Sequence, residues 1–355
     1  MAFAPQRAGR AAGAGRAARG DGRVRAVGWP VAGGLVAGTV LDAIFADPRR
    51  GHPVAAFGRA ATALEARVYA GTRARGALHA AACLLAAAAP AAAADLLSRG
   101  RPVLRLAATA AVCWSVTGAA SLAREAERLA LALESADLAA ARARLPSLCG
   151  RDPSGLGPAD LARAAVESVA ENSCDAVVAP LLWGALLGPA GLAGYRAANT
   201  LDAMVGHRSP RYRDFGWAAA RLDDIASAAP ARLTGVLAAA LAPVVGGRPG
   251  QALRAMRAYG AAHPSPNAGR CEAAFAGALG VRLGGTNVYA GVTEDRPRLG
   301  GGRAATAADI RRAVRLSRAV TWAAAGVAAA LAAALDRALD VAPDSALSPA
   351  VRCRA

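Results

Sequence analysis

Long apolar runs alternate with polar segments along the whole chain. Several of these runs approach the about 20 residues that a helix needs to cross a bilayer. They cover residues 26–46, 77–97, 103–123, 176–195, 233–247 and 319–335. One alanine-rich run alone also fits a buried helix of a soluble bundle, but six in one chain favour a membrane protein. We therefore predict an all-α fold, a polytopic integral membrane helical bundle.

Two of the runs contain residues that interrupt a helix. Residues 176–195 hold two prolines and four glycines, and residues 233–247 hold Pro243 followed by a Gly-Gly pair. Irregular backbone at membrane depth persists only where protein buries it or where it lines a cavity. These two runs therefore predict re-entrant or broken helices.

The chain is expected to form one domain with two irregular ends. Residues 26–340 are predicted to be a single membrane-embedded domain, and residues 341–355 a flexible tail. Residues 1–25, rich in Arg, Gly and Ala, are predicted to be disordered or to lie upstream of the true start. A signal peptide is the competing interpretation, disfavoured because no small-residue cleavage site follows the first run. Residues 119–144 have the spacing of an amphipathic surface helix.

Composition excludes several classes of protein. The chain has 42 basic residues and 25 acidic ones, a net charge of +17, and every basic residue is arginine. Without lysine it has neither a P-loop nor a Schiff-base lysine for pyridoxal phosphate. Nucleic acid is a poor partner, because no stacking aromatics accompany the arginines. The six cysteines form no CxxC pair, so we predict neither a zinc site nor a disulfide framework.

Three acidic residues precede the fourth apolar run. Glu167, Glu171 and Asp175 stand at i, i+4 and i+8, and they share one face of a helix. Carboxylates stacked in this way repel one another and call for a cation, either Mg²⁺ or facing arginines. Asn172 adds a neutral oxygen ligand. A solvated acidic stripe is the alternative, but the stripe leads directly into apolar sequence at Val177, which favours a functional role.

Residues 199–232 concentrate further charge. Asn199 and Asp202 share a helix face, as do Arg221 and Asp224, with Asp223 adjacent. The intervening turn carries arginines suited to phosphate or carboxylate oxygens, or alternatively to anionic lipid: Arg208, Arg211 and Arg213.

Two more segments carry candidate residues. At 263–291, His263 lies in a proline-rich turn, and Asn267 and Gly269 lead into an apolar helix whose first turn is suited to an anion. A glycine-rich loop without a ligand is the alternative. At 41–59, the first apolar run ends in a polar cluster that includes His52.

Taken in order, these segments resemble one family, the membrane-bound cobinamide synthases of cobalamin biosynthesis. The matching pieces are LDAIFADPRRGHPVAAFGR, VESVAENSCDAVVAPLLW, NTLDAMVGHRSPRYRDFGWAAARLDDIASAAPARL and SPNAGRCEAAFAGALGVRLGGTNVYAG, within residues 38 to 300. The resemblance implies a multi-pass protein of the bacterial cytoplasmic membrane.

The resemblance also implies an acid–amine ligase. A carboxylate of adenosylcobyric acid would be joined to aminopropanol or aminopropanol phosphate, giving adenosylcobinamide or its phosphate. Because a carboxylate and an amine do not condense readily in water, we expect ATP as co-substrate and Mg²⁺. Expected partners are the corrinoid, the amine, membrane lipid and other late enzymes of the pathway.

The chemistry then assigns a role to each candidate. Metal ligands are expected among Glu167, Glu171, Asp175, Asp223 and Asp224, and phosphate contacts from Arg211, Arg213 and Arg221. The substrate would be oriented by Asn172, Asn199, Asp202, Asn267 and Gly269. The attacking ammonium group would lose its proton to His52 or His263.

Since ATP is cytoplasmic, all four matching segments are expected to meet on that side of the membrane. Two other functions remain open at this point: a membrane transporter for corrinoids, and a non-catalytic scaffold for corrinoid enzymes. A transporter also uses broken helices, but no inverted repeat is visible.

Overall fold

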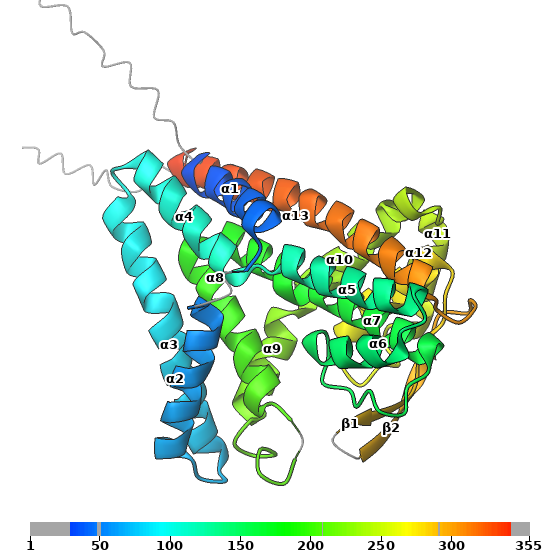
Figure 1. Cartoon of the computed structure of the whole chain (residues 1–355). Coiled ribbons are helices and arrows are strands. Elements are labelled where there is room, and N and C mark those ends of the chain that lie inside the picture. The colour runs from blue at the N-terminus through cyan, green and yellow to red at the C-terminus, as the bar shows by residue number, and fades with distance from the viewer. Residues whose placement is uncertain (1–28, 48–50, 208, 290–291, 342–355) are drawn as a thin grey trace, which may run out of the picture.

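The computed structural model describes residues 29–47, 51–207, 209–289 and 292–341. Within these ranges its regular secondary structure is helical apart from one hairpin and an isolated bridge between Val281 and Arg303 (Figure 1). The expectations for residues 1–25 and for nearly all of 341–355 fall outside the described residues. The helices are α1 (Trp29–Phe45), α2 (Pro53–Val68), α3 (Arg73–Ser98), α4 (Pro102–Val116), α5 (Ala119–Glu134), α6 (Leu138–Arg144), α7 (Pro158–Ser173), α8 (Ala179–Val205), α9 (Trp217–Ala226), α10 (Ala228–Ala240), α11 (Pro249–Tyr259), α12 (Ala268–Leu279) and α13 (Ala307–Val341).

Four helical stretches are long and apolar enough to cross a membrane. They are Arg73–Ser98, Pro102–Glu134, Pro158–Val205 and Ala307–Ala338. On α3 and α4, large apolar side chains point away from the protein, among them Leu85, Leu97 and Val103 with 68%, 81% and 72% exposure. A soluble surface rarely exposes contiguous apolar area of this kind. The prediction of an all-α polytopic bundle is therefore confirmed.

Helices α1, α4 and α13 pack together at one end of the molecule (Figure 1). Two glycines of α1, spaced four apart, bring it close to α4. A Cβ on Gly34 would lie 2.5 Å from Thr109 Cβ, and one on Gly38 would lie 2.4 Å from Cys113 Cβ. Small residues at this spacing are typical of membrane helices that pack with their backbones in close approach.

Both runs predicted to be broken are broken. The first contains a π-helical turn, Cys174–Val178, and then α8, in which Gly188 has φ 64° and ψ −152°. Glycine adopts this backbone conformation without the steric penalty of a side chain. The second run contains the end of α10 and a 3₁₀ turn, Ala242–Val245, after which Gly246 takes the left-handed conformation. The π-helical turn lies in the protein interior, where Cys174 and Val177 are buried, whereas Val244 in the second break is 53% exposed.

The amphipathic segment 119–144 is helical, but it forms two helices, α5 and α6. The chain turns at Ser135–Asp137, where Ala136 has a positive φ of 58°. The apolar face of α5 packs on α7 and α13, and Leu129 is fully buried.

The strands β1 (Leu283–Tyr289) and β2 (Val292–Leu299) form an antiparallel hairpin that the sequence did not predict. The segment VTEDRPRL has no alternation of apolar and polar residues, so it lacks the usual strand signal. The hairpin packs beside α7 and α12. Its position lets β2 contribute charged side chains to the cavity described next.

A candidate active site in an acidic cavity

A polar cavity of about 560 Å³ lies where segments distant in sequence converge. The π-helical turn, the adjoining end of α7 and the C-terminal part of α8 form part of its wall, and α9, the start of α12 and β2 form the rest. Among the described residues, its charged lining has seven carboxylates and one arginine, Arg296. The carboxylates belong to Glu171, Asp175, Asp202, Asp223, Asp224, Glu294 and Asp295.

One asparagine links the acids of two helices. The Nδ2 of Asn199 on α8 donates to Asp175 Oδ2 at 3.3 Å and to Asp223 Oδ1 at 3.2 Å. Ser227 Oγ donates to the same Asp223 oxygen at 3.5 Å. Asn199 thus holds two carboxylates side by side, as expected of a residue that positions others within a site.

The π-helical turn lies directly at this wall. Asp175 is its second residue, and Glu171 stands one turn earlier on α7; both line the cavity. Single π-helical turns often occur at functional sites, because the widened turn shifts the side chains that follow it. The predicted shared face is therefore confirmed for Glu171 and Asp175.

Glu167, the remaining acid of the predicted stripe, does not line the cavity. Its side chain is 7% exposed and accepts from Arg151 Nη2 at 2.6 Å and from the backbone N–H of Gly284 at 2.7 Å. Arg163 Nη1 lies 3.5 Å away. These contacts join α7 to the hairpin, so the structure gives Glu167 a positioning role.

We therefore expect Glu167→Gln to destabilise the protein by about 3–5 kcal/mol, because the substitution removes the carboxylate charge from a buried ion pair with Arg151. Asp160→Asn is the matched control. It removes a pair with Arg163 at 3.2 Å in which the acid is 51% exposed, and it should cost less than about 1 kcal/mol. Denaturation in mixed detergent, with and without Mg²⁺, measures the free energy of unfolding of both variants. A Glu167→Gln protein as stable as wild type, or one that loses stability only when Mg²⁺ is present, would refute the positioning role.

The start of α12 forms the opposite wall. Asn267 Nδ2 donates to the Asp224 backbone carbonyl at 2.8 Å, and its Oδ1 is buried with no hydrogen-bond partner among the residues that the structure describes. Gly269 allows the preceding turn to fold over the helix, since a Cβ there would lie 2.3 Å from His263 Cβ. His263, Asn267 and the helix start are thereby fixed around one edge of the cavity.

Burial and the charges of neighbouring groups shift the pKa values of the titratable side chains in and behind this cavity. Burial, aided by the charge of Asp202, raises the pKa of Asp223 to about 6. Burial also raises the pKa of Glu272, which lies behind the cavity 3.9 Å from His263 Nε2. Burial, followed by the charge of Arg296, lowers the pKa of His263, so its imidazole is neutral near pH 7.

Several predicted site residues lie elsewhere. Arg211 pairs with Glu65 at 2.9 Å and stacks on the Tyr69 ring at 4.1 Å, in the loop after α8. Arg213 and Arg221 are exposed and do not line the cavity, and Arg208 lies outside the described residues. The Asn172 amide donates back to the Ser168 carbonyl at 3.0 Å on its own helix. The charge cluster of residues 199–232 is thus divided between the cavity and a surface loop.

The first of the four matching segments, residues 41–59, adjoins the site without lining it. His52 caps α2 by accepting from Val54 N at 3.1 Å, and its Nε2 lies 3.4 Å from Asp47 Oδ1. The Asp47 N–H donates to Ser121 Oγ at 3.1 Å, beside Gly118, whose N–H donates to the carbonyl of Ala176 in the π-helical turn. Three of the four segments therefore meet in the cavity, and the fourth supports its wall.

Sequence reasoning missed Glu294, Asp295 and Arg296 of β2. Arg296 Nη1 lies 3.4 Å from His263 Nε2, and its Nη2 lies 3.4 Å from Glu294 Oε2. The sequence places a run of charge, EDRPR, directly after a glycine-rich segment. That run was the available signal, but only the hairpin shows that it returns to the site.

The donor set suits a magnesium ion in chemical type. Within the described residues, no group of three or more His, Cys, Asp or Glu side chains is already arranged around a metal position. Mg²⁺ usually binds through one or two carboxylates, several waters and substrate phosphates. The crowded acids of the cavity and the unpartnered Asn267 Oδ1 match that kind of site.

The fold and the cavity together define a polytopic membrane protein with a polar, carboxylate-rich site at the junction of its helices. The model of the CobD/Cbib protein family matches residues 35–317, and the chain belongs to that family.

Curated relatives are similar in sequence to this chain over most of their length. A protein of Mycobacterium tuberculosis named cobalamin biosynthesis protein CobD is 55% identical over 293 residues, 82% of this chain and 93% of the relative. Proteins of the same name from Geobacter metallireducens and Chromobacterium violaceum are 45% and 42% identical, over 75% and 80% of this chain and over 85% and 91% of their own lengths. No solved structure matches the chain. The resemblance inferred from the four segments is confirmed.

Proposed function

We propose that this protein is the ligase of cobalamin biosynthesis that joins a carboxylate of adenosylcobyric acid to aminopropanol or aminopropanol phosphate. Membership of the CobD/Cbib family supports a place in cobalamin biosynthesis. The observation that carries the reaction is the cavity itself, in which three segments of the family resemblance bring acids, Asn199, Asn267 and His263 together.

The acidic wall accounts for recognition of the amine. An aminopropanol ammonium group carries a positive charge, and the cavity lining has a large excess of carboxylates over cations. The ammonium group must lose a proton before its nitrogen attacks. The neutral imidazole of His263 lines the same cavity and is the proposed proton acceptor, whereas His52 lies outside it.

ATP and Mg²⁺ are proposed as the co-substrate and the ion. Phosphoryl transfer to the corrinoid carboxylate would give an acyl phosphate and ADP, and attack by the amine would then form the amide and release phosphate. Glu171, Asp175, Asp223 and Asp224 are the residues proposed to hold Mg²⁺, whose chemistry is to neutralise phosphate charge. Arg296 is proposed to contact the transferred phosphoryl oxygens.

The pKa of Asp223 leads to a test of ion binding. Because the folded pKa of Asp223, about 6, lies above its ordinary value of 3.8, Asp223 favours the folded state most at low pH, and this contribution is lost as the pH rises through about 6. Mg²⁺ binds the ionised form, so the rise in melting temperature on adding Mg²⁺ should be larger at pH 7.5 than at pH 5. Thermal unfolding at both pH values measures it.

Asp223→Asn should remove most of this pH dependence, while Asp152→Asn, at a half-buried acid outside the cavity, should leave it unchanged. Equal stabilisation by Mg²⁺ at the two pH values in wild type would contradict ion binding at Asp223.

Turnover distinguishes the ligase from its two rivals. The protein in sealed vesicles would receive adenosylcobyric acid, aminopropanol phosphate, ATP and Mg²⁺, with mass spectrometry of both compartments. We expect the amide product and one ADP for each product. Entry of unmodified corrinoid without product would support a transporter, and bound corrinoid with neither product nor entry would support a scaffold. Either result would refute the ligase.

A further inference from the structure

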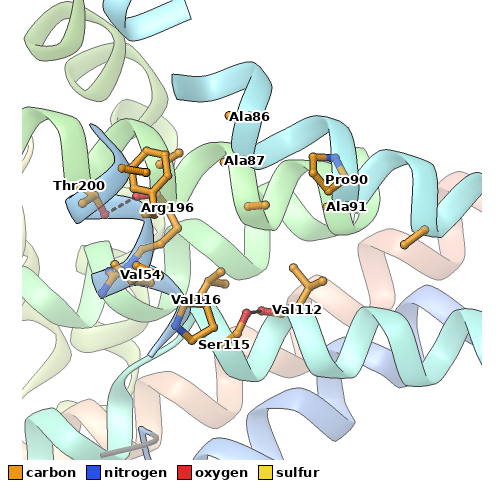
Figure 2. Close-up of a pocket in the computed structure, with 17 residues that line it drawn as sticks. Val54, Ala86, Ala87, Pro90, Ala91, Val112, Ser115, Val116, Arg196 and Thr200 are labelled. Atoms are coloured by element: carbon orange, nitrogen blue, oxygen red, sulfur yellow. Dashed lines mark hydrogen bonds between the residues drawn. The ribbon is translucent and has the colours of Figure 1, made fainter. Parts of the chain in front are cut away.

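A second cavity, of about 590 Å³, lies between α2, α3, α4 and α8. Its lining is mostly alanine, valine and proline, with Phe57 and two hydroxyl side chains, Ser115 and Thr200. Both hydroxyls already donate to carbonyls of their own helices. The one charged side chain in the described lining is Arg196 of α8 (Figure 2). The cavity is therefore an apolar chamber with a single cation.

The Arg196 guanidinium has no anionic partner among the described residues. Its Nε is shielded from solvent, and within the described part of the chain it makes no hydrogen bond and no carboxylate forms an ion pair with the group. Asp175 and Asp47 act on it only over a longer range. Arg196 is half-buried, and a guanidinium that has lost part of its water to an apolar lining is normally paired with an anion. Arg196 thus presents unused donors to whatever fills the chamber.

The chamber has one polar end and one apolar end. Arg196 lies beside Thr200 and Val54 at one end, and Pro90, Ala91 and Val112 lie toward the other (Figure 2). Two of its walls, α3 and α4, belong to membrane-capable stretches of which only 17% and 33% are buried in the protein. A molecule that enters from the bilayer would therefore meet apolar side chains along its length and a guanidinium at one end.

We propose that this chamber binds an anionic phospholipid, with its phosphate on Arg196 and one acyl chain along α3 and α4. An arginine fork matches two phosphate oxygens, and the apolar lining matches a hydrocarbon chain. A small polar anion such as aminopropanol phosphate matches the guanidinium but leaves the rest of the lining without a partner. The proposal is independent of the ligase chemistry, because the chamber is lined by a different set of residues from the acidic cavity.

Thermal unfolding of delipidated protein in detergent tests it. Phosphatidylglycerol should raise the melting temperature saturably, and phosphatidylcholine and inorganic phosphate should raise it much less. Arg196→Gln should weaken phosphatidylglycerol binding roughly tenfold or more, because charged hydrogen bonds are lost. The variant should fold, since it removes an unpaired charge. Ala87→Phe, which fills the apolar part and keeps Arg196, should weaken binding as well.

Arg101→Gln is the matched control, an exposed arginine at the start of α4 that does not line the chamber, and its binding should equal that of wild type. Three results would overturn the proposal. They are equal stabilisation of wild type by both lipids, stabilisation by inorganic phosphate as large as that by phosphatidylglycerol, and unchanged phosphatidylglycerol binding in Arg196→Gln.

Discussion

Asp224→Asn and Glu171→Gln are each expected to lower the rate of amide formation by at least about a hundredfold. Both side chains line the acidic cavity, from α9 and α7 respectively. Each substitution removes one negative charge and keeps the size of the side chain. The loss of one group that stabilises the transition state or holds the ion typically costs about 10²–10³ in rate. Mass spectrometry of the amide product, at saturating Mg²⁺ and ATP, measures the effect.

Asp214→Asn provides the matched control for these variants. It makes the same chemical change in the same charged segment, but Asp214 is exposed and pairs with Arg73 at 3.2 Å outside the cavity. Its rate should stay within about twofold of wild type, since surface ion pairs contribute little. Thermal unfolding of all three variants shows that they are folded. Near-wild-type rates in the two cavity variants would mean that the acidic cavity is not where the amide forms.

Arg296→Gln is expected to have the second largest effect, a loss of about 10²–10³ in rate. Arg296 supplies the only guanidinium in the described lining of the acidic cavity. If it contacts the transferred phosphoryl group, its removal should lower kcat and raise the KM for ATP while binding of the amine changes little. Steady-state kinetics with each substrate varied in turn separates these parameters.

Arg298→Gln is the comparison for Arg296, two residues further along the same strand. Arg298 is exposed and lines a different pocket, so the kinetics of the Arg298→Gln variant should match those of wild type. Arg296→Gln also removes a charge that lowers the pKa of His263, so the pKa of His263 should rise in this variant. An unchanged KM for ATP, or equal effects at Arg296 and Arg298, would contradict the assigned phosphate contact.

Much of the fold was predictable because helix and membrane signals are local. The length and apolarity of a run report a membrane helix without knowledge of its neighbours, and prolines and glycines in residues 176–195 and 233–247 marked the two broken runs. The hairpin was not predictable from pattern, because charged residues occupy much of β2 and no alternation remains. What stabilises the hairpin is long-range, notably the contact of Gly284 N with Glu167.

The candidate site was predicted in part for a similar reason. Residue type and spacing singled out Glu171, Asp175, Asn199, Asp202, Asp223, Asp224, His263 and Asn267, and all of these lie in or beside the acidic cavity. Spacing alone did not separate Glu167 from Glu171, because that distinction depends on Arg151 and on the hairpin. Sequence reasoning also assigned a substrate role to Arg211, but Arg211 pairs with Glu65, which is distant in sequence.

The most direct test of the account is a structure of the protein in nanodiscs with adenosylcobyric acid, aminopropanol phosphate and Mg²⁺, with ATP withheld so that both substrates remain. The account predicts that the amine and one corrinoid carboxylate lie together in the acidic cavity, between Glu171, Asp224 and His263. A corrinoid bound elsewhere, with the acidic cavity holding neither substrate, would contradict it.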